Sequence, residues 1–148
     1  MPDILHRVGI NAPIEKVYEA LTAQAGISSW WTRKVKAVPE VGTIMELYFK
    51  NDALVMKIKV EHLGPPSLVR WRVLDGPPEW IGTTINFVLK PNGSETVVLF
   101  AHRQWKEAVE FMHHCSTKWG YYMFSLKSLI EEGHGTPHPD ERPAGNWG

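Results

Sequence analysis

The chain has 148 residues, of which 43% are hydrophobic and 22% are charged, a balance typical of folded globular domains and not of disordered chains. Sixteen basic residues balance sixteen acidic residues, which removes the electrostatic attraction that non-specific binding to nucleic acid or anionic membranes requires. The apolar runs have the length of strands, so the sequence predicts no membrane-spanning segment and a single domain over residues 1–148.

The first elements are predicted to be a strand and a short helix. Residues 3–10 alternate between apolar and polar side chains, as expected of a strand with one buried face. In residues 11–22, Pro13 suits the first helical position, and apolar residues recur at the spacing of one helix face. A further turn is expected before the adjacent tryptophans Trp30 and Trp31.

The middle of the chain repeats strand-like segments between turn-forming residues. The predicted strands are 43–50, 54–63, 68–74, 81–90 and 94–105. In the second of these, Leu54, Met56, Ile58 and Val60 face one way and charged residues face the other, so only one sheet face is buried. The short, regular connections predict an antiparallel meander.

Residues 106–132 change to a helical period and predict one long amphipathic helix. Its apolar stripe consists of Met112, Cys115, Trp119, Tyr122, Leu126 and Leu129. Gly133 is a natural C-terminal stop. Residues 134–148 are rich in proline and glycine and are expected to form an irregular tail.

This element order predicts an α+β fold with a ligand pocket. A sheet with one apolar face must be covered, and the single long helix is the available cover. A strongly twisted sheet around one helix does not pack flush everywhere. We therefore expect a pocket between the sheet and the C-terminal helix that takes a small, largely apolar ligand.

Two segments carry a family resemblance. The residues 11–22, followed by Trp30 and Trp31, together with residues 118–139, resemble the helix-grip (START-like, SRPBCC) superfamily. That superfamily includes birch-pollen allergen relatives, START lipid-transfer domains and polyketide cyclases. The branch most similar to the chain is named after the activator of the heat-shock chaperone ATPase. The resemblance covers about residues 4–139. It implies a curved antiparallel sheet wrapped around a long C-terminal helix, short helices after the first strand, and an interior cavity, with no catalytic signature.

Seven tryptophans are an unusual number for a chain of this length. An indole offers a large apolar surface and one N–H group, so a set of indoles can fill a core or line an apolar cavity. The candidate cavity residues are Trp31, His62, Trp71, Trp80, Phe87, Arg103, Trp105, Phe111, Trp119, Tyr122 and Met123.

Three polar residues have two interpretations each. His62 shares the inward parity of its strand, where it could bind ligand or act as a base, but a strand-end histidine is also commonly exposed. His102 and Arg103 are adjacent, and the pattern does not decide which one points inward. An inward Arg103 would favour a carboxylate or enolate ligand, whereas an outward one would be a surface residue.

No metal or cofactor is expected. His113, His114 and Cys115 are consecutive on a helix and point in different directions, so they cannot close around one ion. Cys115 lies on the apolar stripe and is expected to pack as a small hydrophobe. Glu46 and Tyr48 share the polar side of their strand, and only a reversed parity would place them in the pocket.

A cytoplasmic location is expected from the N-terminus and the cysteine content. The chain does not begin with the charged-then-apolar pattern of a signal peptide. Its single cysteine, Cys115, cannot form an internal disulfide, in agreement with a reducing compartment.

Three functions fit these observations. The first is a carrier or sensor, in stress or otherwise, that binds a small hydrophobic or aromatic molecule. The second is an enzyme of the polyketide cyclase or aromatase kind, in which a buried His or an Arg–Tyr pair transfers protons. The third is a co-regulator of a chaperone ATPase that acts through the exposed sheet face. Binding to nucleic acid and insertion into membranes are not expected, and edge strands could pair in a homodimer.

Overall fold

Seven antiparallel strands form one sheet in the order β1-β7-β6-β5-β4-β3-β2 in the computed structural model, which describes residues 1–148. The strands are β1 (Ile4–Ile10), β2 (Val35–Lys36), β3 (Ile44–Phe49), β4 (Leu54–Gly64), β5 (Leu68–Asp75), β6 (Thr84–Asn92) and β7 (Glu95–Arg103). The helices are α1 (Ile14–Thr22), α2 (Gln24–Trp30), the 3₁₀ helix η1 (Pro78–Trp80) and α3 (Glu110–Glu132).

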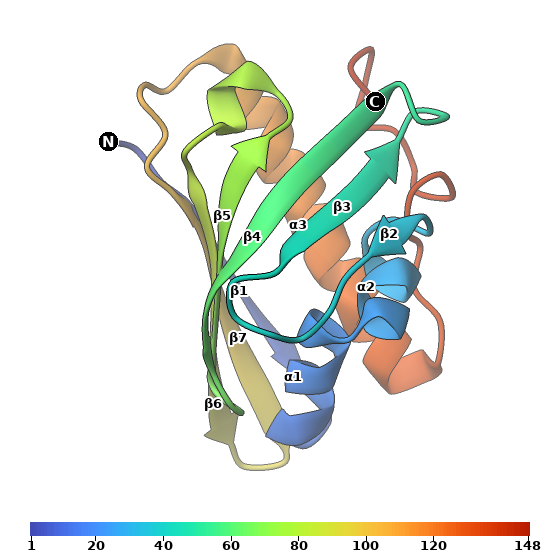
Figure 1. Ribbon diagram of the computed structural model, residues 1–148. Coiled ribbons are helices and arrows are strands. Elements are labelled where there is room, and N and C mark those ends of the chain that lie inside the picture. Colours follow the sequence, from blue (N-terminus) through green and yellow to red (C-terminus); the bar gives the residue numbers. More distant parts are fainter.

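The sheet curves around α3, and α1 and α2 cover one end of its concave face (Figure 1). The predicted α+β helix-grip architecture, with short helices after the first strand and one long C-terminal helix, is therefore confirmed. None of the helices has the length and apolar character that a membrane span needs.

Alternating burial explains why the strands form where the sequence predicts them. In β4, Met56, Ile58 and Val60 are buried while Lys57 and Lys59 are exposed. A period of two keeps each strand's apolar side on the concave face, where α3 lies. The side chains of Glu46 and Tyr48 are only half-buried on the opposite face of β3, so the reversed parity does not occur.

Two boundaries differ from the sequence expectation by more than two residues. The strand expected from residue 81 begins at Thr84, because residues 78–80 form η1 and Gly82 continues the turn with a φ of 87°. The last helix begins at Glu110 and not at residue 106. The apolar pattern continues through η1 and through the segment before Glu110. The periodicity of the sequence therefore predicted that both elements begin too early in the chain.

A β-bulge in β4 corrects the expectation for His62. Val60 pairs with Trp71 and the next paired residue is His62, opposite Arg70, so Glu61 is the additional residue. One extra residue reverses the parity of the strand beyond it. His62 is therefore exposed on the outer face, and the expectation that it points inward is wrong.

Stacked indoles fill the space between the sheet and α3. The ring centroid of Trp31 lies 5.6 Å from that of Trp30 and 5.8 Å from that of Trp71, and in both pairs the ring planes are nearly parallel. Trp119 of α3 lies 5.1 Å from Trp31 and stacks on Trp80 at 5.8 Å. All of these indoles are buried, so they form a continuous aromatic layer across the core.

The C-terminal tail is irregular, as expected, but it packs against the body of the protein. Gly133 ends α3 with a φ of 91°. Ser125 of α3 donates to the carbonyl of Trp30 at 2.9 Å and accepts the amide of Thr136 at 2.8 Å. The amide of His138 then donates to the carbonyl of Trp31 at 2.8 Å. The tail thereby runs back along α2 toward β3, as the red segment of Figure 1 shows.

Candidate ligand-binding cavity

A cavity of about 830 Å³ lies between the β3–β4 turn, η1, the N-terminal half of α3 and the C-terminal tail. Its volume falls within the roughly 300–1,000 Å³ typical of small-molecule sites. α1 and α2 cover one end of the concave face, whereas these four segments lie at the opposite end (Figure 1).

The floor of the cavity is apolar and aromatic. Trp31, Trp80 and Trp119 line it together with Met56 and Phe111. The indole N–H of Trp119 donates to His102 at 3.1 Å, so this ring turns its hydrogen-bonding edge away from the cavity. Because the three indoles contact one another within the core, their faces offer a preformed surface for an apolar ligand.

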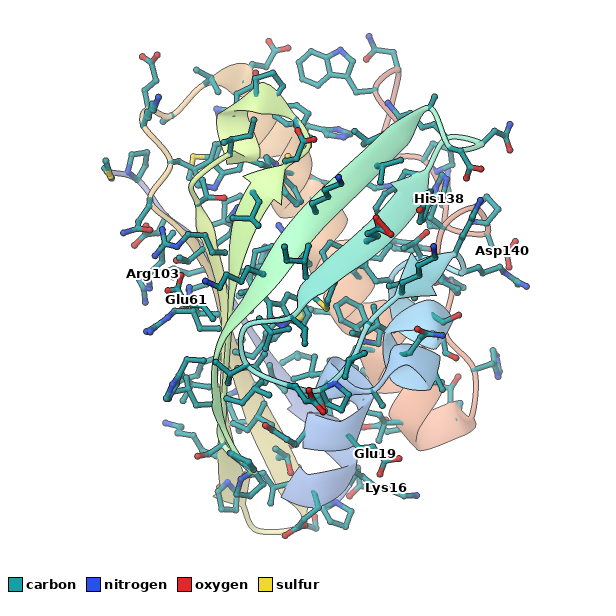
Figure 2. All side chains as sticks on the ribbon, viewed as in Figure 1. Lys16, Glu19, Glu61, Arg103, His138 and Asp140 are labelled. Atoms are coloured by element: carbon teal, nitrogen blue, oxygen red, sulfur yellow. The ribbon has the colours of Figure 1, made fainter.

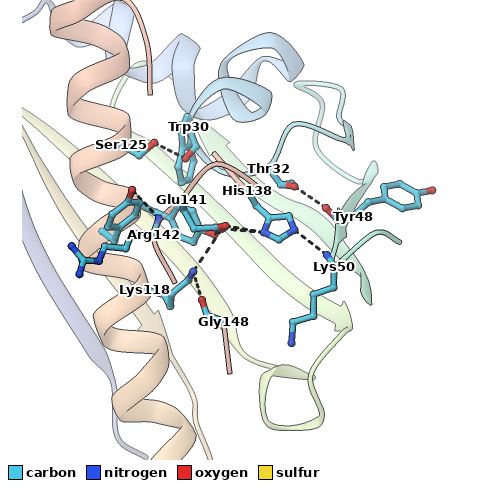
Figure 3. Close-up of polar contacts among 12 residues, drawn as sticks. Trp30, Thr32, Tyr48, Lys50, Lys118, Ser125, His138, Glu141, Arg142 and Gly148 are labelled. Carbon is cyan, nitrogen blue, oxygen red and sulfur yellow. Dashed lines mark hydrogen bonds and ion pairs between the residues drawn. The ribbon is translucent and has the colours of Figure 1, made fainter. Parts of the chain in front are cut away.

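One wall of the cavity carries a largely buried polar cluster, which we call the Glu141 cluster: Lys118, Tyr122, His138 and Glu141. Figure 3 shows Lys118 and His138 on either side of Glu141. The hydroxyl of Tyr122 donates to Glu141 Oε2 at 2.5 Å, and Nδ1 of His138 lies 3.0 Å from Oε1. The ammonium of Lys118 lies 3.6 Å from Oε2. Burial, and secondly the Glu141 carboxylate, raise the pKa of Tyr122, so this hydroxyl remains a donor.

The ring of His138 is held in one tautomer. Its Nε2 accepts the backbone N–H of Lys50 at 2.9 Å, and an amide N–H can only donate. Nδ1 therefore carries the proton and donates to Glu141. His138 links the β3–β4 turn to the tail and, through Glu141, to α3, so it serves as an anchor and not as a free base.

His102 is the inward member of the His102–Arg103 pair. Its ring is fully buried, with Nδ1 accepting from Trp119 and Nε2 lying 2.8 Å from the hydroxyl of Thr83. Burial lowers the pKa of His102 to about 3. Arg103 lies on the side of the sheet away from α3, paired with Asp3 at 2.6 Å (Figure 2).

Burial favours the uncharged form of two further groups at the cavity. Burial raises the pKa of the Cys115 thiol to about 12, while the Trp80 indole N–H donates to its sulfur at 3.3 Å. Burial, and secondly the charges of Lys118 and Lys50, lower the pKa of His114. No group of three or more His, Cys, Asp or Glu side chains is placed to hold a metal ion.

Residues 11–131 match the family described as Activator of Hsp90 ATPase homolog 1-like protein. The chain belongs to this family. The resemblance to the helix-grip superfamily and to this branch is thereby confirmed. A search of curated proteins found no match.

Solved structures share the fold of this family member. The Aha1 dimer from Colwellia psychrerythraea is 38% identical, with a TM-score of 0.82 over 91% of this chain and 100% of that chain. Protein MLL2253 from Mesorhizobium loti is 18% identical, with a TM-score of 0.78 over 88% of this chain and 98% of that one. DynU16, a putative protein in the dynemicin biosynthetic locus, is 20% identical, with a TM-score of 0.76 over 90% of this chain and 48% of that one.

The structure separates the eleven sequence-derived candidates into three groups. The candidates in the first group line the cavity: Trp31, Trp80, Phe111, Trp119 and Tyr122. Those that are buried in the core without reaching it are Trp71, Phe87, Trp105 and Met123. Trp71 stacks on Trp31 within the aromatic layer, and Phe87 contacts Trp71 at 5.1 Å. His62 and Arg103 lie on the outer surface.

Several lining residues were not found from the sequence. Lys50 lies in a turn, Lys118 flanks the apolar stripe of α3, and His138, Glu141 and Trp147 belong to the tail. A proline- and glycine-rich segment carries no periodic signal of its tertiary contacts. The one available sign was chemical: His138, Glu141 and Trp147 can bind or stack, although they stand in a segment rich in proline and glycine.

Proposed function

We propose that this chain binds a small hydrophobic or aromatic molecule in the cavity, as a carrier or sensor. The observation that carries the proposal is the cavity itself, about 830 Å³ in volume with indole faces on its floor. Apolar lining with a few polar groups at one side is the usual composition of a small-molecule site. Burying apolar ligand surface against these rings supplies the driving force for binding.

The chemistry of the buried groups supports a carrier over an enzyme. Both ring nitrogens of His102 are engaged inside the core, and His102 does not line the cavity. Arg103 is on the outer surface with Asp3. The thiol of Cys115, with its pKa of about 12, is a poor nucleophile. Neither His102 nor Arg103 is thus available in the cavity for proton transfer, and the Tyr122 and His138 side chains that do line it are both hydrogen-bonded to Glu141.

Titration with a neutral fluorescent probe tests this proposal. N-phenyl-1-naphthylamine should bind saturably to the purified chain, and lipids, flavonoids or polyketide-like aromatics of one class should displace it. Leu54 lines the cavity, so Leu54→Trp should fill space and weaken probe binding by about tenfold or more.

Val55 provides a matched control for that variant. It is the next residue of β4, is half-buried and does not line the cavity, so Val55→Trp should leave the affinity for the probe unchanged. The proposal fails if the chain shows no saturable binding, or if both variants weaken it equally.

A second candidate function is co-regulation of a chaperone ATPase through protein contacts, as the family description suggests. Leu5 and Val88 are 63% and 40% exposed on the outer face of the sheet, and exposed apolar residues are common at protein interfaces. In this case the chain should change the ATPase rate of a purified Hsp90, and Val88→Lys should reduce the effect. An unchanged rate at saturating chain would eliminate this candidate.

Self-association is a related proposal. The similar structure from Colwellia psychrerythraea is named as a dimer. We expect this chain to form a homodimer as well, and sedimentation velocity over a range of concentrations would decide this. A single species at the monomer mass at every concentration would contradict it.

A further inference from the structure

We propose that the indole N–H of Trp31 is a hydrogen-bond donor for the cavity ligand, and that this ligand is a neutral, largely apolar compound with a carbonyl oxygen. This inference rests on the proposed small-molecule function and specifies its ligand class. The observation behind it is where each indole N–H of the aromatic layer finds an acceptor.

Three indole N–H groups of the aromatic layer are paired within the chain. Trp30 donates to a backbone carbonyl at 2.9 Å. Trp80 donates to the sulfur of Cys115 at 3.3 Å, and Trp119 donates to Nδ1 of His102 at 3.1 Å. Such pairing is the rule for buried donors, because a buried N–H without an acceptor is destabilising.

Trp31 departs from this rule at the wall of the cavity. It is only 1% exposed and lines the cavity, yet its Nε1 donates to no acceptor of the chain. The one side-chain nitrogen or oxygen that is both unpaired and sealed from any accessible space is Nε1 of Trp105. Nε1 of Trp31 therefore keeps accessible surface, and the space that Trp31 borders is the cavity.

Packing fixes the direction of the Trp31 N–H. Trp30 and Trp71 stack nearly parallel to its ring at 5.6 and 5.8 Å, and Trp119 lies against it at 5.1 Å. Its backbone carbonyl accepts the amide of His138 at 2.8 Å, so the main chain is held as well. A donor that is fixed before the ligand arrives costs little conformational entropy on binding.

The other polar groups of the lining favour a neutral ligand. Lys118 lies 3.6 Å from Glu141 and already binds an oxygen of Gly148 at 2.6 Å. The hydroxyl of Tyr122 and the Nδ1–H of His138 both donate to Glu141. A charged head group would find no free partner among these groups.

A carbonyl is the simplest group that satisfies the free indole N–H. Its oxygen accepts a hydrogen bond and brings no charge to the apolar floor. An alcohol would also accept, but its own O–H would then need an acceptor. We therefore expect ketones to use this donor.

Ligand pairs with and without a carbonyl test the inference. 9-Fluorenone and fluorene have nearly the same shape, and benzophenone and diphenylmethane form a second pair. Their affinities would be measured by displacement of N-phenyl-1-naphthylamine. Because a hydrocarbon leaves water more readily than its ketone, the affinity ratio within each pair is compared between variants. Trp31→Phe should shift this ratio by about tenfold toward the hydrocarbon.

Trp71 provides a matched control. It is also 1% exposed and stacks on Trp31 in the same layer, but it does not line the cavity. Trp71→Phe removes the same ring area and should keep the ratio of the parent. If Trp31→Phe is unstable, benzothienylalanine at position 31 removes the N–H and keeps the shape of the ring. The C=O stretching band of bound benzophenone should rise in wavenumber in either chain altered at position 31.

The outcomes separate the two proposals. An unchanged ratio in the chain altered at position 31, or an equal shift in Trp71→Phe, overturns the carbonyl ligand and leaves the small-molecule function standing. Absence of any saturable binding by N-phenyl-1-naphthylamine and by all four ligands overturns both.

Discussion

The pKa of His102 is about 3 in the folded chain, because burial disfavours the charged imidazolium, against an ordinary value of 6.5. The two hydrogen bonds of the ring require the neutral form, since the Trp119 indole can only donate to Nδ1. Protonation of Nδ1 would set two N–H groups against each other within the core. The residue therefore couples the stability of the fold to pH.

The sign of this coupling follows from proton uptake. Between about pH 6.5 and about pH 3, the unfolded chain binds a proton at His102 and the folded chain does not. The stabilisation is fully present above about pH 6.5 and is lost as the pH falls toward the folded pKa. At about pH 4.5 this group alone should lower the free energy of unfolding by about 2–3 kcal/mol.

Urea unfolding at about pH 7 and about pH 4.5 measures this loss. His102→Asn is the comparison, since its side-chain oxygen can accept from the Trp119 indole and cannot take up a proton in this range. The variant should be less stable than the parent at neutral pH but lose less stability on acidification. If the parent and the variant lose the same amount, His102 is not the titrating group.

Cys115 offers a second test of burial at a single residue. Its pKa of about 12 against an ordinary 9.0 reduces the thiolate population at neutral pH by about a thousandfold. Iodoacetamide should therefore modify the folded chain far more slowly than the urea-unfolded chain, as followed by mass spectrometry. Similar rates in both states would mean that the thiol is exposed and ionisable.

At the scale of elements, the C-terminal tail converts an open end of the sheet into a cavity. Its position depends on close packing: a Cβ on Gly135 would lie 2.5 Å from the carbonyl oxygen of Ser29, so only glycine fits there. Beyond this point the tail is attached to α3 through Glu141 and to the β3–β4 turn through His138. Glu141 is thus one of the polar links that hold the tail against α3.

Glu141→Gln should loosen the tail while the sheet remains intact. The amide keeps the size of the side chain but loses the charge that faces Lys118 and His138, at an expected cost of about 1–3 kcal/mol. Hydrogen exchange should become faster in residues 137–148 and stay unchanged in β5–β7. Glu132→Gln, at an exposed position at the end of α3, is the control, and unchanged exchange in the tail would contradict this role of Glu141.

The sequence predicts strands well where burial has a period of two and fails where chemistry depends on tertiary contact. Met56, Ile58 and Val60 were placed correctly by alternation, but the extra Glu61 reverses the parity at His62. The position of Glu61 on the outer face is stabilised by Arg72, whose Nε–H donates a hydrogen bond to its carboxylate at 2.5 Å. Such a pairing across strands is invisible until the register is known.

The candidate site was less predictable than the fold for a related reason. The apolar pattern identifies which side chains point inward, and Trp71 and Trp119 both do. It does not tell which inward side chains meet the cavity and which lie beneath another ring. Likewise, the contact between Lys118 and Gly148 joins residues that are far apart in the chain, and the spacing of charges in one segment carries no signal of it.

At the scale of the whole molecule, the cavity results from unequal cover of one curved sheet. α1 and α2 pack against α3 at one end of the concave face, whereas η1 and the tail lie at the other end (Figure 1). Indoles line the cavity between them. The walls therefore belong to segments that are distant in sequence: the β3–β4 turn, η1, α3 and the tail. A ligand that contacts all of these segments can bind only to the folded chain.

Ligand binding should consequently raise the thermal stability of the whole chain. At a free ligand concentration about 100 times the Kd, linkage predicts about 2.7 kcal/mol of stabilisation. For a chain of this size, that corresponds to a rise in Tm of about 5–10 °C. Differential scanning calorimetry with benzophenone would measure the shift. Because Leu54→Trp fills the cavity and Val55→Trp does not, only the former should abolish the shift, and an equal rise in both variants would mean that the stabilising ligand binds outside the cavity.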